Sequence, residues 1–339
     1  MASDTISTQT APSPDLYFDT IFAYQRSAAL KSALELEVFT AIDGGAHTAA
    51  EIAQACGVPE RGIRILCDYL TTLGFLTKAG DRYDLTQDSA VFLTKRSPAY
   101  LGGTAEFLHS HQLVDYLNRL TDTIRRGGVE AHSMVDGENP AWVQFARAMV
   151  PMMMPAAQAI ADLLGGPPAG PMRVLDIAAG HGIFGIVLAQ RHSRAEITAV
   201  DWRSVLEVAT ENANAMGVGA RHRTLAGSAF EVDYGSGYDV ALVTNFIHHF
   251  DWRTNVEFLQ RVAAALKDDG RVVVLEFVPN EDRVSPPMAA RFSLTMLSNT
   301  PRGDAYTFRE LRGILEEAGF GKVTAHPLPG PETVVIGTK

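Results

Sequence analysis

Apolar residues in the second half of the chain alternate between short continuous runs and repeats with helical spacing. The runs predict buried strands and the repeats predict helices. The strands are 173–178, 195–200, 238–246 and 270–277, and the helices are 183–190, 205–215, 256–266 and 307–319. KVTAHPL and ETVVIGT then follow in immediate succession as two more strands. The pattern predicts a mainly parallel sheet with helices on both faces, ligands beyond the carboxyl ends of its strands, and a terminal hairpin.

The first third of the chain has a different pattern. Residues 1–14 are polar, small and proline-bearing, which predicts a disordered tail. Apolar residues between 15 and 42 recur too densely for one narrow helix face, which favours helices buried on more than one side, against a second subunit. In 48–76 a Thr48/Glu51 capping box, a Gly57-Val58-Pro59 turn and a second helix precede two short strands. Helix, turn, helix and hairpin predict a winged helix.

Residues 101–165 read as helical and connect the two halves. They contain Met149 and the run Met152-Met153-Met154, and three adjacent methionines cannot share one helix face. We therefore expect some of them to line a cavity with adaptable apolar walls. The Gly- and Pro-rich segment 164–171 then ends the helix. The expected domains are 15–100, 101–165 and 166–339.

Composition narrows the function classes. The 339 residues are 46% hydrophobic and carry a net charge of -10, which is typical of a globular protein without affinity for nucleic acid. The winged helix, 48–97, has six basic and six acidic side chains, so it lacks the basic face of a DNA reader. No long apolar run or signal peptide is visible, so we expect no membrane association and a cytoplasmic location. Cys56 and Cys67, the two cysteines, are expected to be core residues without a disulfide.

The stretch RVLDIAAGHGIFGI, 173–186, contains the spacing of a dinucleotide-binding turn at the start of a helix. Asp176 stands inside that turn, where it repels a pyrophosphate but can pair with a cationic ligand. Asp201 ends the next strand, where a carboxylate can accept both ribose hydroxyls. The pattern favours an adenosine with a positively charged neighbour, which describes S-adenosylmethionine better than NAD.

Five segments together resemble the class I S-adenosylmethionine-dependent small-molecule O-methyltransferases that carry an N-terminal winged-helix dimerisation domain. They are VLDIAAGHG, AVDW, GSAF, NFIHHFD and VVVLEFVPN, and the similarity spans about residues 20–339. The resemblance implies a Rossmann-like sheet of seven strands with a terminal antiparallel hairpin, a homodimer with interlocked N-terminal helices, catalysis by a histidine base, and no metal. His109-x-His111 lacks a Cys or carboxylate at ligand spacing, in line with the last point.

The resemblance also implies which residues bind the cofactor. The matching positions are Asp176, Gly180 and Gly182 in the loop, Asp201 at the ribose, Trp202, Ser228, Ala229 and Phe230 at the adenine, and Asn245. Ala178 and Ala179 stand where the family commonly has glycine, and Ser228 stands where it often has Asp. We therefore expect a slightly altered loop and a changed adenine contact.

His248 aligns with the family's catalytic histidine, and Glu276 with the acidic residue that orients it. His249 takes a position that is Asp in the family, and a second acid is replaced by Ala305 and Tyr306. A neutral imidazole can accept the proton of a phenol, more effectively when a carboxylate stabilises the imidazolium. Since strand residues alternate faces, one of the two histidines should face the pocket and one should point away. We expect His248 to be the base.

The substrate is expected to be a small aromatic or polyketide-like hydroxyl compound enclosed by apolar side chains. The candidates for this wall are Phe145, Met149, Met153, Phe292 and Met296. Alternatives remain open at this point. The same fold could methylate carbon or nitrogen or perform another reaction, and the chain could be a winged-helix regulator that senses a ligand or an NAD-dependent dehydrogenase.

Overall fold

A computed structural model describes residues 12–130, 139–165 and 170–339. The chain forms two compact units, Met1–Gly102 and Gly103–Lys339. Residues 1–11 of the predicted tail and 166–169 of the predicted boundary segment lie outside the described residues.

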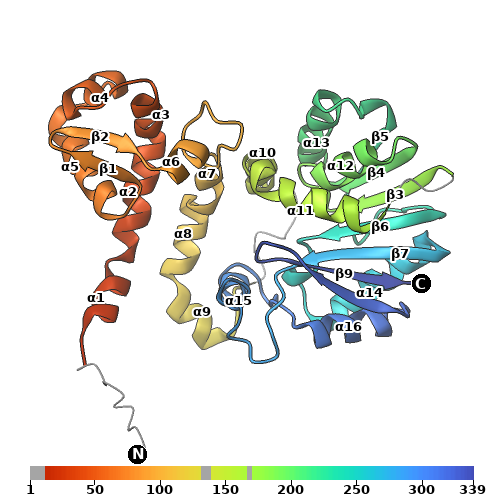
Figure 1. Cartoon of the computed structure of the whole chain (residues 1–339). Helices are drawn as coiled ribbons and strands as arrows, with labels where there is room; N and C mark the ends of the chain where they lie inside the picture. The colour runs from red at the N-terminus through yellow and green to blue at the C-terminus, as the bar shows by residue number, and fades with distance from the viewer. Residues whose placement is uncertain (1–11, 131–138, 166–169) are drawn as a thin grey trace, which may run out of the picture. The chain divides into compact units, whose positions relative to one another are not determined.

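The first unit contains the predicted winged helix (Figure 1). Its elements are α1 (Asp15–Ile21), α2 (Ala23–Glu35), α3 (Val38–Asp43), α4 (Ala49–Cys56), α5 (Glu60–Thr72), β1 (Leu76–Ala79), β2 (Arg82–Leu85) and α6 (Gln87–Phe92). The Thr48 hydroxyl accepts the N–H of Glu51, and the Glu51 carboxylate accepts the N–H of Thr48, so the predicted capping box starts α4. Cys56 and Cys67 are both free thiols.

The start of the first unit exposes large apolar side chains. α1 has no buried residue, and the exposed side chains there and just after it are Leu16, Tyr17, Phe18, Ile21, Phe22 and Tyr24. Leu16 is 81% exposed and Tyr24 67% exposed. Within one chain these residues therefore lack the burial that their apolar density predicts.

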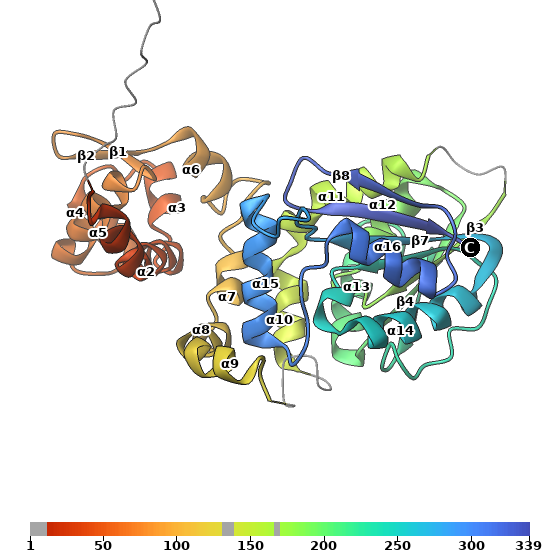
Figure 2. The same cartoon turned by 90° about the horizontal axis from the view of Figure 1, so that it is seen from below.

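The second unit begins with helices, so most of the segment predicted as a connector belongs to this unit. They are α7 (Thr104–Leu108), α8 (His111–Asn118), α9 (Leu120–Arg126), α10 (Pro140–Ala148) and α11 (Val150–Leu163). A later helix, α15 (Pro287–Asn299), packs beside α8 and α9 (Figure 2).

A seven-stranded sheet forms the centre of the second unit, with the order β5-β4-β3-β6-β7-β9-β8. The strands are β3 (Met172–Ile177), β4 (Ala195–Asp201), β5 (His222–Ala226), β6 (Tyr238–Thr244), β7 (Leu266–Glu276), β8 (Val323–Pro327) and β9 (Thr333–Thr338). The first five in this order pair in parallel, and β9 pairs antiparallel with both β7 and β8. The predicted fold class and its terminal hairpin are confirmed.

Helices cover both faces of this sheet (Figure 1). Alternate strand residues such as Val174 and Leu242 pack with α11 and α12 (Ile183–Arg191), and their neighbours Leu175 and Val243 pack with α14 (Trp252–Ala265) and α16 (Phe308–Glu317). α13 (Arg203–Ala215) lies beside α12 and β4. Because both faces of the central strands are buried, β3 and β6 are mostly apolar, whereas the edge strands β5 and β8 are more polar and partly exposed.

In the described part of the chain, no helix combines the length and apolarity that a membrane crossing requires.

Candidate active site

A cavity of about 280 Å³ opens at the carboxyl ends of β3, β4, β6 and β7. Its lining is mostly apolar. Among the described lining residues, Asp201 is the only one with a carboxyl group, and none is Lys or Arg. The predicted site residues that line it are Phe145, Met149, Met153, Gly180, Asp201, Trp202, Ser228, Ala229, Phe230, Asn245, His248, Phe292 and Met296. Sequence positions from 145 to 296 thus converge on one cavity.

Asp176 and Gly182 do not line the cavity and instead stabilise the glycine loop. Asp176 is fully buried, its Oδ2 accepts the N–H of Gly185 at 3.1 Å, and burial raises its pKa to about 8. A Cβ at Gly185 would lie 2.7 Å from that oxygen, so only glycine fits there. Gly182 has φ of 73° and packs closely on Ala209. Ala178 in the same loop also has a positive φ, 52°, and it stands at one of the positions where the family commonly has glycine.

Asp201 is held by backbone donors at the end of β4. Its Oδ2 accepts the N–H of Gly180 at 2.8 Å, and its Oδ1 accepts the N–H of Trp202 at 2.7 Å. Burial raises the pKa of Asp201 to about 6, against the lowering effect of these two donors. The carboxylate is therefore fixed and retains lone pairs for ligand hydroxyls.

The cavity wall next to Asp201 consists of aromatic and small side chains. Trp202 and Phe230 line the cavity, and the Phe230 ring packs edge-on against Phe250 with centroids 4.9 Å apart. The Ser228 hydroxyl accepts the N–H of Phe230 at 3.2 Å, so it stabilises the turn in which it stands. Such a wall suits a flat apolar ring.

Asn245 follows β6 with a left-handed φ of 52°. Its amide lowers the pKa of Glu332, while burial raises that pKa to about 7. Glu332 immediately precedes β9 and is 7% exposed. Sequence reasoning missed this buried acid because it stands in a Pro- and Gly-rich turn that carries no motif.

His248 and Glu276 form a buried pair. The His248 Nδ1 atom lies 2.5 Å from Oε2 of Glu276, and the other carboxylate oxygen accepts the backbone N–H groups of Phe246 and His248 at 3.1 and 3.3 Å. Burial lowers the pKa of His248 to about 3 and raises that of Glu276 to about 8. The imidazole is thus neutral, with its Nδ1 edge turned to the carboxyl group.

The expectation that only one of the two histidines faces the pocket is wrong. β6 ends at Thr244, and Ile247–His249 form a 3-10 helix, so the alternation of a strand does not apply. Both His248 and His249 line the cavity, with ring centroids 4.2 Å apart. His249 also packs edge-on against Trp142, at 5.7 Å between centroids.

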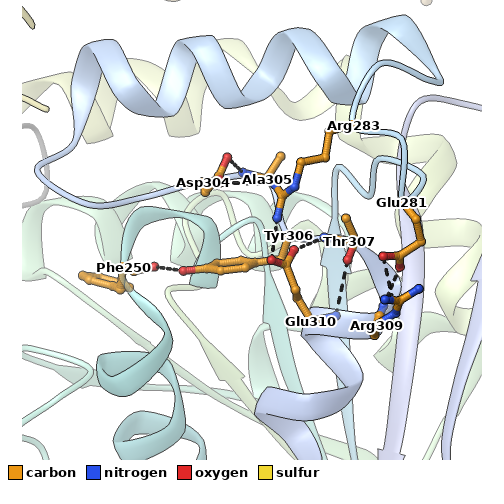
Figure 3. A network of polar contacts seen from close by, with 9 residues as sticks. All are labelled: Phe250, Glu281, Arg283, Asp304, Ala305, Tyr306, Thr307, Arg309 and Glu310. Carbon is orange, nitrogen blue, oxygen red and sulfur yellow. Dashed lines mark hydrogen bonds and ion pairs between the residues drawn. The ribbon is translucent and has the colours of Figure 1, made fainter. Parts of the chain in front are cut away.

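Two side chains support the histidine turn (residues 247–250), one from nearby in the sequence and one from far along the chain. The Asn255 amide donates to the carbonyls of Ile247 and Phe250 at 2.9 and 3.2 Å. The Tyr306 hydroxyl donates to the same Phe250 carbonyl at 2.5 Å (Figure 3). The sequence did not single out Asn255, and it identified Tyr306 only as standing, with Ala305, where the family has a second acid.

The opposite wall is built from aromatic rings and methionines. α10 ends at Ala148 and α11 starts at Val150, and this break lets Met149, Met152 and Met153 all reach the cavity. Phe292, on α15, stacks on Phe277 at 4.0 Å and packs edge-on against His248 at 4.8 Å. The predicted apolar wall therefore meets the histidines directly.

No group of three or more His, Cys, Asp or Glu side chains arranged to hold a metal ion occurs within 12–130, 139–165 and 170–339.

Comparisons with known proteins agree with this architecture. The O-methyltransferase dimerisation domain model matches residues 18–95, and the O-methyltransferase domain model matches 161–321. The crystal structure of a putative O-methyltransferase from Nostoc punctiforme is 50% identical, covers 97% of this chain and all of that chain, and superposes with a TM-score of 0.94.

Two curated relatives are similar over most of their length. The 3-hydroxy-5-methyl-1-naphthoate 3-O-methyltransferase of Streptomyces sahachiroi is 28% identical over 96% of this chain and 95% of its own length. The tetracenomycin polyketide synthesis 8-O-methyl transferase of Streptomyces glaucescens is 28% identical over 94% of each chain. The predicted family is confirmed: the chain belongs to the S-adenosylmethionine-dependent O-methyltransferases that carry an N-terminal dimerisation domain.

Proposed function

We propose that this protein methylates a hydroxyl group of a small aromatic or polyketide-like metabolite, with His248 as the general base. The observation that carries the proposal is the buried His248 and Glu276 pair in the wall of an apolar cavity that also contains Asp201 and the glycine loop. The two curated Streptomyces relatives, whose names specify a naphthoate and a polyketide, support the substrate class.

The residues at the glycine-loop end of the cavity fit S-adenosylmethionine. Asp201 would accept the ribose hydroxyls, Trp202 and Phe230 would enclose the adenine, and Gly180 permits close backbone approach. The terminal antiparallel hairpin of β8 and β9 departs from the two repeated halves of a dinucleotide fold, which disfavours NAD. When bound, this cofactor supplies a methyl group on a sulfonium, a carbon already activated for displacement.

His248 then has one chemical task. With Glu276 ionised, the Nδ1 proton of His248 is donated to the carboxylate, and Nε2 is free to take the proton of the substrate hydroxyl. A phenol with a pKa of about 10 loses that proton to a neutral imidazole more readily when a carboxylate stabilises the imidazolium. The apolar wall of Phe292 and Met296 excludes water and aligns the hydroxyl for in-line transfer.

We also propose that two copies associate through the exposed apolar residues of α1 and the start of α2. An isolated helix that exposes Leu16, Phe18 and Phe22 gains stability by burying them against a second copy. The match of this region to a dimerisation domain supports the proposal. Sedimentation should give a dimer for the wild type and a monomer for Phe18→Glu combined with Phe22→Glu. A monomeric wild type would contradict it.

The activity is tested by calorimetric titration with S-adenosylmethionine, S-adenosylhomocysteine and NADH, followed by mass spectrometry of phenolic acceptors. We expect binding of the first two only, and a mass gain of one methyl on oxygen. His248→Ala should lower kcat by about 10² to 10⁴-fold while cofactor binding persists. Methylation at carbon or nitrogen, or full activity of His248→Ala, would contradict the proposal.

A further inference from the structure

We propose that His249 is a second substrate-binding residue, a fixed hydrogen-bond acceptor that selects aromatic acceptors carrying two hydroxyl groups on neighbouring ring carbons. One hydroxyl meets His248 and is methylated, and the other donates to His249. This inference rests on the proposed function, because it assigns the hydroxyl partner of His248.

The contacts of His249 determine which of its ring nitrogens carries the proton. Its Nδ1 lies 3.0 Å from the backbone oxygen of Phe246. A carbonyl oxygen can only accept, so Nδ1 is the donor, and Nε2 of the neutral ring is an acceptor. Burial and the neighbouring His248 lower the pKa of His249 to about 3, so the ring stays neutral at physiological pH.

The second ring nitrogen of His249 has no protein partner within the described residues. Nδ1 makes the one hydrogen bond that the His249 ring forms with the described residues, which leaves Nε2 available, and the ring is one of the cavity-lining groups. The edge-on contact with Trp142 and the bond to Phe246 hold the ring in place. A fixed acceptor on an otherwise apolar wall calls for a donor on the ligand.

His248 presents a matching acceptor beside it. When Glu276 is ionised, Nδ1 of His248 donates to the carboxylate and Nε2 is left for the substrate. The two rings are adjacent in sequence, share the turn Ile247–His249 and have centroids only 4.2 Å apart. Two imidazole rings so close, with Phe292 against one and Trp142 against the other, suit two O–H donors on neighbouring atoms of a flat ring.

A ligand with a single hydroxyl can satisfy only one of these acceptors. The other Nε2 then has no donor on the ligand, and sites built to hydrogen-bond a ligand hydroxyl discriminate against analogues that lack it. His249 stands where the family has Asp, so this preference would be specific to chains with His there.

The test compares catechol, hydroquinone and phenol on the full-length enzyme. Binding is measured by calorimetry in the presence of S-adenosylhomocysteine, at a pH above the pKa of Glu276, and methyl transfer is measured with S-adenosylmethionine. Hydroquinone also has two hydroxyls but cannot reach both histidines, so it controls for hydroxyl number. We expect catechol to bind about tenfold more tightly than hydroquinone, the value of one hydrogen bond.

Three variants test whether His249 causes the preference for catechol. His249→Phe keeps an aromatic ring but removes the acceptor, so the catechol-to-hydroquinone ratio should fall to about one, whereas His249→Gln supplies an amide oxygen and should partly restore the ratio. His326→Phe removes a histidine on β8, outside the cavity lining, and should leave the ratio unchanged.

Equal binding of catechol and hydroquinone to the wild type, or a preference that survives in His249→Phe, would overturn the inference. Its failure can be told apart from failure of the proposed function. Methylation of all three compounds without preference overturns only the role of His249. A catechol preference in binding, with no methylation of any compound, leaves that role standing and overturns the proposed activity.

Discussion

Two groups of ionisable side chains, one at the histidine turn and one around Arg283, differ mainly in burial. His248 and Glu276 meet at 2.5 Å with 6% and 3% of their side chains exposed. Arg283 and Glu310 also meet at 2.5 Å, with 44% and 30% exposed, in a network that includes Asp304, and Arg309 pairs with Glu281 nearby (Figure 3). Equal distances therefore accompany very different environments.

Environment, rather than distance, decides what each pair can do. In the buried pair, desolvation lowers the pKa of His248 and raises that of Glu276, so the neutral form of each side chain is favoured. A proton can therefore be exchanged between them. In the exposed network water and salt screen the charges, so each ion pair contributes on the order of 0–1 kcal/mol to folding. The buried pair is suited to catalysis. The exposed network connects the loop at Arg283 to the start of α16.

Among the variants that test the difference between the two groups, Glu276→Gln should cause the largest loss of activity. Glutamine keeps the shape of the side chain but has no negative charge to stabilise an imidazolium on His248. We expect kcat to fall by roughly 10² to 10³-fold with little change in Tm. Glu281→Gln, which removes the exposed acid paired with Arg309, is the matched control and should retain activity within about twofold. Equal losses in both variants would contradict the distinction.

The pH dependence of activity should report the same buried carboxyl. Burial raises the pKa of Glu276 to about 8, and the base form of the pair requires Glu276 ionised. Ionisation is complete above that pKa and is lost as the pH falls, so kcat/KM should rise with pH and level off above about 8. The inflection should disappear in Glu276→Gln. A wild-type profile that is flat between about pH 6 and 9 would show that the carboxyl is not the controlling group.

Tyr306→Phe tests the link between the two groups. The Tyr306 hydroxyl bonds to the Phe250 carbonyl of the histidine turn, and its neighbour Asp304 belongs to the exposed network. Loss of one buried hydrogen bond should lower stability by about 1 kcal/mol, and the looser turn should lower kcat several-fold with an unchanged pH profile. Thermal unfolding and steady-state kinetics measure both effects. A shifted pH inflection would instead place Tyr306 in the proton-transfer machinery.

The sequence predicted the parts of the site that depend on local pattern. The glycine loop, Asp201 and the strands that carry them follow from apolar periodicity and spacing over a few residues. The capping box at Thr48 is equally local. His248 and Glu276 were found through resemblance to a family, and the structure brings them within hydrogen-bond distance.

The remainder depends on contacts between distant segments. The assumption that a strand runs through His248 and His249 was wrong because the chain turns after Thr244, and Asn255 holds that turn. Tyr306 reaches Phe250 across 56 positions, and the buried Glu332 directly precedes β9, which pairs with the distant strand β7. No spacing rule along one sequence encodes such contacts.

The smallest predicted effect concerns Arg283, which combines two exposed ion pairs with a left-handed backbone, φ 56°. Arg283→Ala loses the ion pairs and keeps the unfavourable φ, so its stability should fall by no more than about 1 kcal/mol. Arg283→Gly loses the same ion pairs but adopts this φ without steric cost, so it should be more stable than the Ala variant by about 1 kcal/mol. Thermal unfolding of the two variants measures the difference directly. Because neither change touches the histidine turn, kcat should stay within twofold of the wild type, whereas a larger loss would mean that the exposed network also positions His248.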